Sequence, residues 1–190
     1  MKKEATLIIV DMQNDFIDGV FSNADAQRIV EPIVDLMCGW DGNIILTRDT
    51  HQYNYLDTPE GKKLPIRHCV QGTEGWCVHD AIMQTVLALL GTNGVPCDFI
   101  DKSTFGYIEW REWGNPELCD DIYIVGTCTD ICVISNALIL KAMFPEKNIT
   151  VISDLCAGTT TENHEAALNV MRSCQVDVIS EEEFRNMQKE

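Results

Sequence analysis

Short apolar runs alternate along the chain with longer segments in which apolar residues recur every three or four positions. Six runs are rich in β-prone residues, and most are continuously apolar instead of alternating with polar residues. A strand of that kind is covered on both faces, as in a parallel sheet. The predicted strands cover residues 6–11, 43–48, 98–102, 122–126, 149–154 and 176–180.

Helical periodicity fills the stretches between these runs. Thr160 or Thr161 can cap the last helix. Alternating strands and helices predict right-handed crossovers and a parallel sheet between two helical layers. We therefore expect an α/β fold: a three-layer α/β/α sandwich with a central, mainly parallel six-stranded sheet, in one domain spanning residues 1–190. The predicted helices cover residues 29–37, 81–90, 134–143 and 162–174.

Composition narrows the class of protein. The 190 residues carry a formal net charge of −16, and nine cysteines are scattered at irregular spacing. The acid surplus argues against nucleic acid or an anionic membrane surface as partner, because phosphate binding needs clustered Lys and Arg. Scattered cysteines in odd number do not resemble a disulfide framework, and we find neither a signal-peptide core nor a membrane-length apolar run. We expect a soluble cytoplasmic protein with a small-molecule partner.

A cysteine follows the fourth predicted strand, where that strand turns into a helix. The segment GTCTDICV, residues 126–133, reads as a tight loop between them. Thr129 or Asp130 can cap the helix, which places Cys132 in its first turn. N–H groups and the helix dipole at that position favour a thiolate. We therefore take Cys132 as the candidate nucleophile.

Two charged residues stand at other strand ends. Asp11 ends the first predicted strand and Lys102 the third. Ligand sites in such sheets lie beyond the carboxyl ends of the strands, so these side chains and Cys132 can form a nucleophile with its activating charges. Each residue also has an ordinary structural explanation, because turn-forming Asp, solvated Lys and inert buried Cys are all common.

Possible metal ligands gather in the long connection after the second strand. Asp49 and His51 stand at its start, and Glu60 and His68 follow within it. This set of nitrogen and oxygen donors suits zinc, manganese or iron(II). By ligand chemistry alone, a metal site and a structural role are about equally well supported.

Five segments match a known family. In them the chain resembles the cysteine hydrolases of the isochorismatase-like superfamily, and within it the nicotinamidase/pyrazinamidase group. The segments fall in order and span most of the chain, which argues against chance agreement. They are LIIVDMQNDF (7–16), TRDTH (47–51), RHCVQGT (67–73), DK (101–102) and GTCTDICV (126–133).

The resemblance implies hydrolysis of nicotinamide to nicotinate and ammonia. By this resemblance Cys132 attacks the amide carbonyl carbon and forms a thioester, Asp11 moves the thiol proton to the leaving ammonia, and Lys102 stabilises both charges. The family's oxyanion hole uses backbone N–H groups, here those of Cys128 and Cys132. It depends on a cis peptide bond that would fall at Thr127-Cys128.

The resemblance also implies one divalent metal ion. Asp49, His51 and His68 match the ligands of nicotinamidases, in which the metal binds the pyridine nitrogen of the substrate. Glu60 lies at the spacing where some members place a fourth ligand, with Asp57 as the competing residue. We expect zinc first, with manganese or iron as alternatives. The retained ligand set favours nicotinamidase over isochorismatase or a carbamoyl-amide hydrolase.

The substrate pocket matches the family less completely. Phe16 matches a pocket aromatic, but residues 64–66 carry no ring where many nicotinamidases have Trp or Phe. A missing ring would weaken stacking on the pyridine by about 1 kcal/mol. Phe105, Tyr107 or Trp110 from the second long loop can supply it. The expected pocket residues are Phe16, Leu64, Phe105, Tyr107 and Thr127.

Other classes of protein stay open at this point. A binding module on the same fold would lack catalysis, and a thiol-redox protein would pair Cys132 with Cys128. Within the family, the alternatives are isochorismatase and a cysteine hydrolase of another small amide or carbamoyl compound. Members of the family often assemble into dimers or tetramers, so the resemblance implies a homo-oligomer.

Overall fold

Six parallel strands form the central sheet in the order β3-β2-β1-β4-β5-β6. The computed structural model describes residues 5–92, 94–112 and 118–189. Every neighbouring pair of these strands is parallel, which confirms the predicted α/β fold with its six-stranded sheet. The strands are β1 (Ala5–Val10), β2 (Asn43–Asp49), β3 (Cys97–Lys102), β4 (Asp121–Thr127), β5 (Asn148–Ala157) and β6 (Asp177–Ile179).

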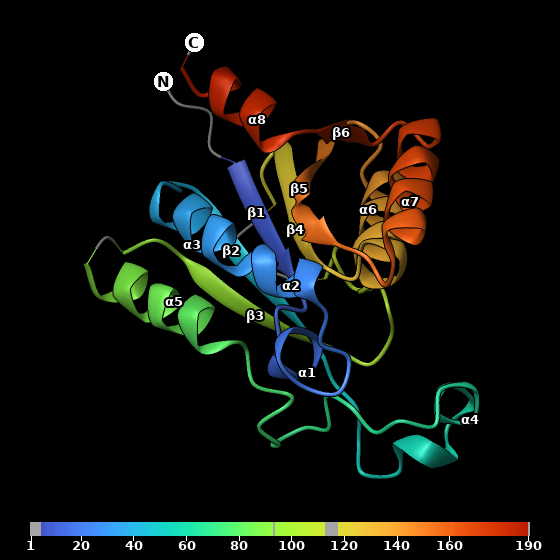
Figure 1. Ribbon diagram of the computed structural model, residues 1–190. Coiled ribbons are helices and arrows are strands. Elements are labelled where there is room, and N and C mark those ends of the chain that lie inside the picture. The colour runs from blue at the N-terminus through green and yellow to red at the C-terminus, as the bar shows by residue number, and fades with distance from the viewer. Residues whose placement is uncertain (1–4, 93, 113–117, 190) are drawn as a thin grey trace.

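Helices cover both faces of the sheet. Figure 1 shows α3 and α5 on one side and α6 and α7 on the other, with α4 projecting away from the sheet on a long connection. None of the helices in the described ranges has the length and apolar composition that a bilayer crossing requires. The α-helices are α1 (Asn14–Ile17), α2 (Ala24–Arg28), α3 (Val30–Cys38), α4 (Pro59–Lys63), α5 (Asp80–Thr92), α6 (Ile134–Met143), α7 (Thr161–Ser173) and α8 (Glu181–Met187).

The continuously apolar strand β1 joins the two halves of the core. Leu7 and Ile9 belong to the cluster that α3 and α5 complete, whereas Ile8 and Val10 belong to the cluster of α6 and α7. All four side chains are fully buried, and each contributes about 1.5–3 kcal/mol on burial. This central position of β1 fixes the residue that follows it, Asp11, at the carboxyl end of the sheet.

Strand β5 is longer than predicted because the ladder between β4 and β5 shifts register. The shift lies between Ile124 and Gly126, and it lets pairing continue to the end of β5. Gly126 has a φ of 117°, and a Cβ there would lie 2.2 Å from the Val10 carbonyl oxygen. Only glycine allows this close approach of β4 to β1.

The start of α7 follows the prediction. The Thr160 hydroxyl accepts a hydrogen bond from the Asn163 N–H at 3.1 Å, which makes it the N-cap. A capping hydroxyl satisfies one of the backbone donors that the first helical turn leaves unpaired. Thr160 is therefore the cap among the two residues that the sequence offered.

The segment before α6 differs from the prediction. A π-helical turn, Thr129–Val133, carries Cys132, and α6 begins only at Ile134. The expected caps, Thr129 and Asp130, make no cap on that helix. The reason is tertiary: their side chains bond to residues at and before the start of α7 instead of to nearby N–H groups.

Those tertiary bonds are short and specific. The Thr129 hydroxyl lies 2.8 Å from His164 Nδ1. The Asp130 carboxylate accepts hydrogen bonds from both the N–H and the hydroxyl of Thr159, at 2.8 and 2.5 Å. These partners are distant in sequence, and the hydrogen bonds to them replace the local capping bonds that the pattern predicts.

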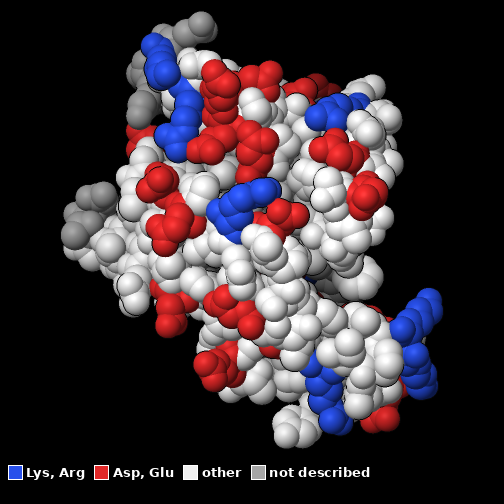
Figure 2. All heavy atoms as spheres, in the orientation of Figure 1, with Lys and Arg blue, Asp and Glu red and all other residues white. Residues whose placement is uncertain are grey.

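Acidic side chains form several separate patches on the visible surface. Figure 2 shows Asp and Glu spread over several parts of this face, with Lys and Arg in fewer places. The distribution agrees with a net charge of −16 carried by solvated side chains.

Candidate active site

The carboxyl ends of the strands bring Asp11, Lys102 and Cys132 together. Asp11 directly follows β1, Lys102 ends β3 and Cys132 lies in the turn after β4. Lys102 Nζ lies 2.6 Å from Asp11 Oδ2 and 3.6 Å from Cys132 Sγ. The lysine extends past β2, which separates β3 from β1, and so contacts both partners.

Burial controls the protonation of this group. Asp11, Lys102 and Cys132 are 0%, 2% and 4% exposed. Burial alone would lower the pKa of Lys102, but the negative charge of Asp11 outweighs it and raises that pKa. Burial raises the pKa of Asp11, and the Lys102 charge opposes this effect. Lys102 is therefore a cation at neutral pH.

The cysteine differs from the sequence-based expectation. Burial, followed by the charge of Asp11, raises the pKa of Cys132 well above its usual value, although Lys102 acts in the opposite direction. The expected thiolate at the first turn of an α-helix is wrong, because Cys132 lies in the π-helical turn and is buried. The resting group is a thiol, and it needs a base to become a nucleophile.

Two threonines hold Asp11 in an unusual backbone conformation. Asp11 has a φ of 49°, in the left-handed region. The Thr47 hydroxyl donates to Asp11 Oδ1 at 2.7 Å, and the Thr127 hydroxyl donates to the Asp11 carbonyl at 3.0 Å. Non-glycine residues adopt this conformation at a cost of about 1–3 kcal/mol, so these contacts fix the carboxylate against local preference.

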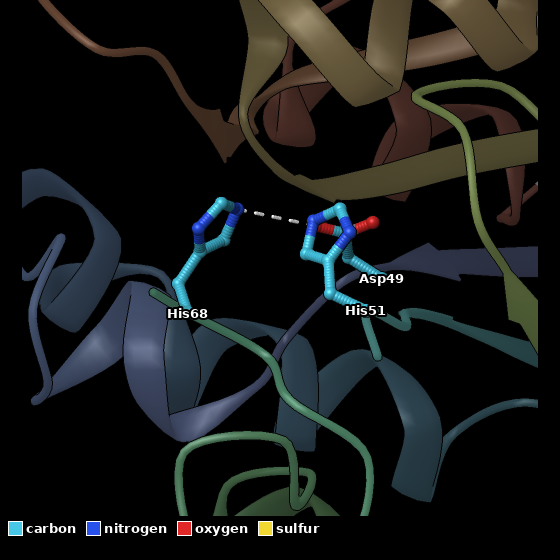
Figure 3. Close-up of side chains that lie close together, drawn as sticks. All are labelled: Asp49, His51 and His68. Carbon is cyan, nitrogen blue, oxygen red and sulfur yellow. Dashed lines mark ion pairs between the residues drawn. The ribbon is translucent and has the colours of Figure 1, made fainter. Parts of the chain in front are cut away.

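A second cluster of buried polar side chains lies beside the first. Asp49 ends β2, His51 follows it, and His68 comes from the loop after α4 (Figure 3). His51 Nε2 lies 2.9 Å and His68 Nε2 3.5 Å from Asp49 Oδ2. The three ligand atoms lie within 4.8 Å of one another, and all three residues are buried.

This cluster has the properties of a metal site. Asp49 Oδ1 is buried without a hydrogen-bond partner, and such an atom costs about 1–3 kcal/mol unless a ligand satisfies it. His68 Nδ1 contacts the Ile66 carbonyl at 2.9 Å, which leaves its Nε2 free to bind a metal. Burial favours a neutral Asp49, but contacts with His51 and His68 outweigh it and lower the pKa of that carboxyl. One carboxylate and two imidazoles fit zinc or a similar divalent ion.

Glu60 lies at the side of this cluster. Its Oε1 is 3.6 Å from His51 Nε2 and 3.5 Å from the Tyr55 hydroxyl. Its side chain is 26% exposed, and Asp57, the competing residue, is exposed. Glu60 therefore faces the cluster from the projecting connection, and its role as a ligand stays a prediction.

The two clusters are connected through Lys102 and Gln13. Lys102 Nζ lies 3.8 Å from Asp49 Oδ1. Gln13, which is fully buried, accepts from the Asp49 N–H at 2.6 Å and donates to the Asp49 carbonyl at 2.9 Å. Gln13 was not among the residues predicted from the sequence, although it lies in a matched segment two residues after Asp11.

Aromatic rings surround the two histidines. The Tyr55 ring centroid lies 4.5 Å from that of His51, and the Phe21 centroid lies 4.8 Å from that of His68. Phe16 lies 5.9 Å from His68 and stacks with Phe21 at 6.2 Å. Phe16 was expected here from the sequence, but Phe21 and Tyr55 were not, because the segments that carry them have no periodic pattern that would place their rings here.

The other expected pocket residues occupy different environments. Leu64 and Phe105 are 39% and 45% exposed, and the Thr127 hydroxyl is buried against Asp11. Tyr107 makes an edge contact with Trp110 at 5.1 Å. The Trp110 ring is buried in the core cluster of α6 and α7, so Phe105 and Tyr107 are the candidate rings with exposed surface from this loop.

Comparisons with known proteins agree with this geometry. The family described as the isochorismatase domain matches residues 5–183. A nicotinamidase of Schizosaccharomyces pombe is 28% identical over 217 aligned positions, which cover 96% of each chain.

Solved structures show the same fold. A nicotinamidase/pyrazinamidase structure from Bacillus subtilis matches with a TM-score of 0.76 at 22% identity, covering 93% of this chain and 100% of that one. The pyrazinamidase of Pyrococcus horikoshii in complex with zinc matches with a TM-score of 0.68 at 23% identity, covering 93% and 99%.

Proposed function

This chain belongs to the isochorismatase family, as an amidohydrolase, and we propose that it hydrolyses nicotinamide to nicotinate and ammonia. The observation that carries the proposal is the position of Lys102, which contacts Asp11, Cys132 and Asp49 at one edge of the sheet. The proposed nucleophile, the proposed base and the proposed metal ligands therefore share one buried site. The name of the S. pombe relative, a nicotinamidase, supports the choice of substrate.

The first half of the proposed reaction forms a thioester. Asp11 takes the proton of the Cys132 thiol, and Sγ attacks the amide carbonyl carbon. The C–N bond breaks, and Asp11 passes the proton to the leaving nitrogen, which departs as ammonia. Lys102 stabilises the negative charge that moves between carboxylate and sulfur.

The second half releases the acid. Asp11, again ionised, takes a proton from a water molecule that attacks the thioester carbon, and the C–S bond breaks to return the thiol. Backbone N–H groups of Cys128 and Cys132 would stabilise the oxyanion in both steps. The peptide bond between Thr127 and Cys128 is cis, as the family resemblance implies.

Metal binding is the second part of the proposal. Asp49, His51 and His68 would hold a divalent ion, with Glu60 as a fourth ligand. When bound, such an ion supplies a coordination position for the ring nitrogen of the substrate. The zinc named for the P. horikoshii pyrazinamidase supports zinc first, with manganese or iron as alternatives.

The ring of the substrate would lie among aromatic side chains. Phe16 and Phe21 are adjacent to His68 and can form one wall. Leu64, Phe105 and Tyr107 would bound the entrance. Thr127 would contribute by holding Asp11 in place, because its hydroxyl donates a hydrogen bond to the Asp11 carbonyl.

The test is ammonia release from nicotinamide by the purified protein. We expect turnover that chelator abolishes and that added zinc, manganese or iron restores. Cys132→Ala should remove turnover and keep the fold, whereas Cys174→Ala, at an exposed thiol, should leave it unchanged. Turnover retained by Cys132→Ala would refute the mechanism. Absent turnover in the folded, metal-loaded protein would refute nicotinamide as the substrate.

A further inference from the structure

Asn136 is a fully buried amide one helical turn after Cys132. Its Nδ2 donates to the Cys132 carbonyl at 2.9 Å and to the Phe105 carbonyl at 3.3 Å. Its Oδ1 accepts from the Tyr107 N–H at 2.9 Å. One side chain thus joins the turn that carries Cys132 to the loop that follows Lys102.

The position of Asn136 in the helix is not explained by helix formation. Asn is a poor residue in a helix interior, and a buried amide is tolerated only when its polar atoms are hydrogen-bonded. Its neighbours on the buried face of α6, Ala137 and Leu140, are apolar and fully buried. An apolar residue at 136 would suit this core, so the amide is accounted for by its three backbone partners.

The loop lies tightly against α6 at the same place. A Cβ at Gly106 would lie 2.4 Å from Ile139 Cδ1 and 3.1 Å from the Ser135 carbonyl carbon. The Thr104 hydroxyl donates to the Gly106 carbonyl at 2.7 Å and closes the turn. Glycine at position 106 permits the close approach of the loop to α6, and Asn136 forms the hydrogen bonds between the helix and the loop.

We propose that Asn136 is a positioning residue that fixes the 103–110 loop relative to Cys132. Its bonds to Phe105 and Tyr107 place two candidate pocket side chains, and its bond to the Cys132 carbonyl places the nucleophile. The kinetic consequence rests on the proposed amidase function. The loop should therefore affect substrate binding, and the carbonyl contact should affect the chemical step.

Two substitutions separate these contacts. In Asn136→Thr, the hydroxyl can donate to the carbonyl four residues earlier and keep the Cys132 bond, but it is too short to replace the bonds to Phe105 and Tyr107. Asn136→Ala removes all three bonds. The control is Leu140→Ala, which weakens the buried face of the same helix, one turn further from Cys132.

The readouts are hydrogen–deuterium exchange of residues 103–110 and the kinetics of ammonia release. We expect exchange and KM to rise at least about fivefold in both Asn136 variants, the factor that corresponds to about 1 kcal/mol per buried hydrogen bond. kcat should fall about tenfold or more in Asn136→Ala and stay within about twofold in Asn136→Thr. Leu140→Ala should lower the melting temperature but leave loop exchange, KM and kcat unchanged.

Each outcome bears on the proposal. It is overturned if the Asn136 variants match Leu140→Ala in both loop exchange and KM. If Asn136→Ala does not fold, Asn136→Thr decides through the same two readouts. If the wild-type protein releases no ammonia from nicotinamide, the proposed function fails, and loop exchange alone still decides whether Asn136 holds the loop.

Discussion

The two halves of the site are built in different ways. Asp11, Lys102 and Cys132 stand at strand ends or in the turn after a strand, so the sheet itself sets their spacing. Of the proposed metal-binding half, only Asp49 ends a strand. His51 and His68 come from the long connection between β2 and α5, which contains little regular structure.

In the second half, one side-chain hydrogen bond and one isolated backbone bridge take the place of the sheet. The Asp15 carboxylate accepts a hydrogen bond from the Cys69 N–H at 2.7 Å, directly after His68. His51 pairs with Val70 in an isolated bridge. Cys69 has a φ of 44°, a strained conformation that these bonds maintain. The comparison teaches that the proposed nucleophile depends on global packing, whereas the proposed metal ligands depend on a few local contacts.

The largest expected effect comes from Lys102, which belongs to both halves. Lys102→Ala leaves a buried Asp11 without its ion pair and should lower the free energy of unfolding by about 3–5 kcal/mol. Ammonia release should fall by at least about a thousandfold, because the charge beside both thiol and base is lost. Urea unfolding and steady-state assays measure the two effects.

A surface lysine provides the control for this change. Lys141 on α6 contacts the Pro145 carbonyl outside the site, and Lys141→Ala should change stability and activity little. Activity of Lys102→Ala within about tenfold of wild type would show that Lys102 does not link the two halves.

Asp15 tests the metal-binding half alone. Asp15→Ala removes the acceptor for the Cys69 N–H, so His68 loses its anchor. Metal affinity should fall by about 10–100-fold, as for other residues that orient ligands. Cys132 alkylation should stay unchanged. Asp18→Ala, at a largely exposed carboxylate paired with His79, is the control, and an equal loss of affinity there would contradict the local explanation. Metal titration by calorimetry is the measurement.

The alkylation rate of Cys132 in Asp11→Asn is the smallest expected effect, and it tests the first half. The charge of Asp11 helps to raise the pKa of Cys132, and Lys102 acts to lower it. Asp11→Asn removes the like charge, so the pKa of Cys132 should fall and alkylation at pH 8 should become about tenfold faster. In the wild type, alkylation should rise with pH and still be rising above pH 9.

Mass spectrometry can follow this alkylation at Cys132, with the exposed Cys174 as internal reference. Ammonia release should be lost in Asp11→Asn even as the thiol becomes more reactive, because the base is gone. Slower alkylation of Cys132 in this variant would contradict the proposed electrostatics.

The half of the site that stands at the strand ends was predicted from the sequence better than the half that comes from the long connection after β2. Continuous apolar runs located all six strands, and Asp11 and Lys102 were placed from the ends of those runs. The caps expected at Thr129 and Asp130 were wrong because their partners, His164 and Thr159, lie about thirty residues later. Local patterns carry no information about such contacts.

The absence of long-range information in local patterns also explains two further differences between prediction and structure. A thiolate at Cys132 was expected from local helix geometry, but burial, a property of the whole fold, decides its pKa. The rings of Phe21 and Tyr55 reach the histidines through loops whose course no periodicity records. The motif at residues 67–73 identified His68 as a ligand candidate, and the position of its ring became known only from the structure.

Lys102 also sets the charge balance of the buried site. With Asp11 and Asp49 ionised, two negative charges face one positive charge, and the edge of the sheet has a deficit of positive charge. Protons and divalent cations compete to fill such a deficit, since histidine ligands bind a metal only when neutral. Acidity and occupancy of the proposed metal site should therefore be coupled, so that the metal content of the purified protein should depend on the pH of its buffer.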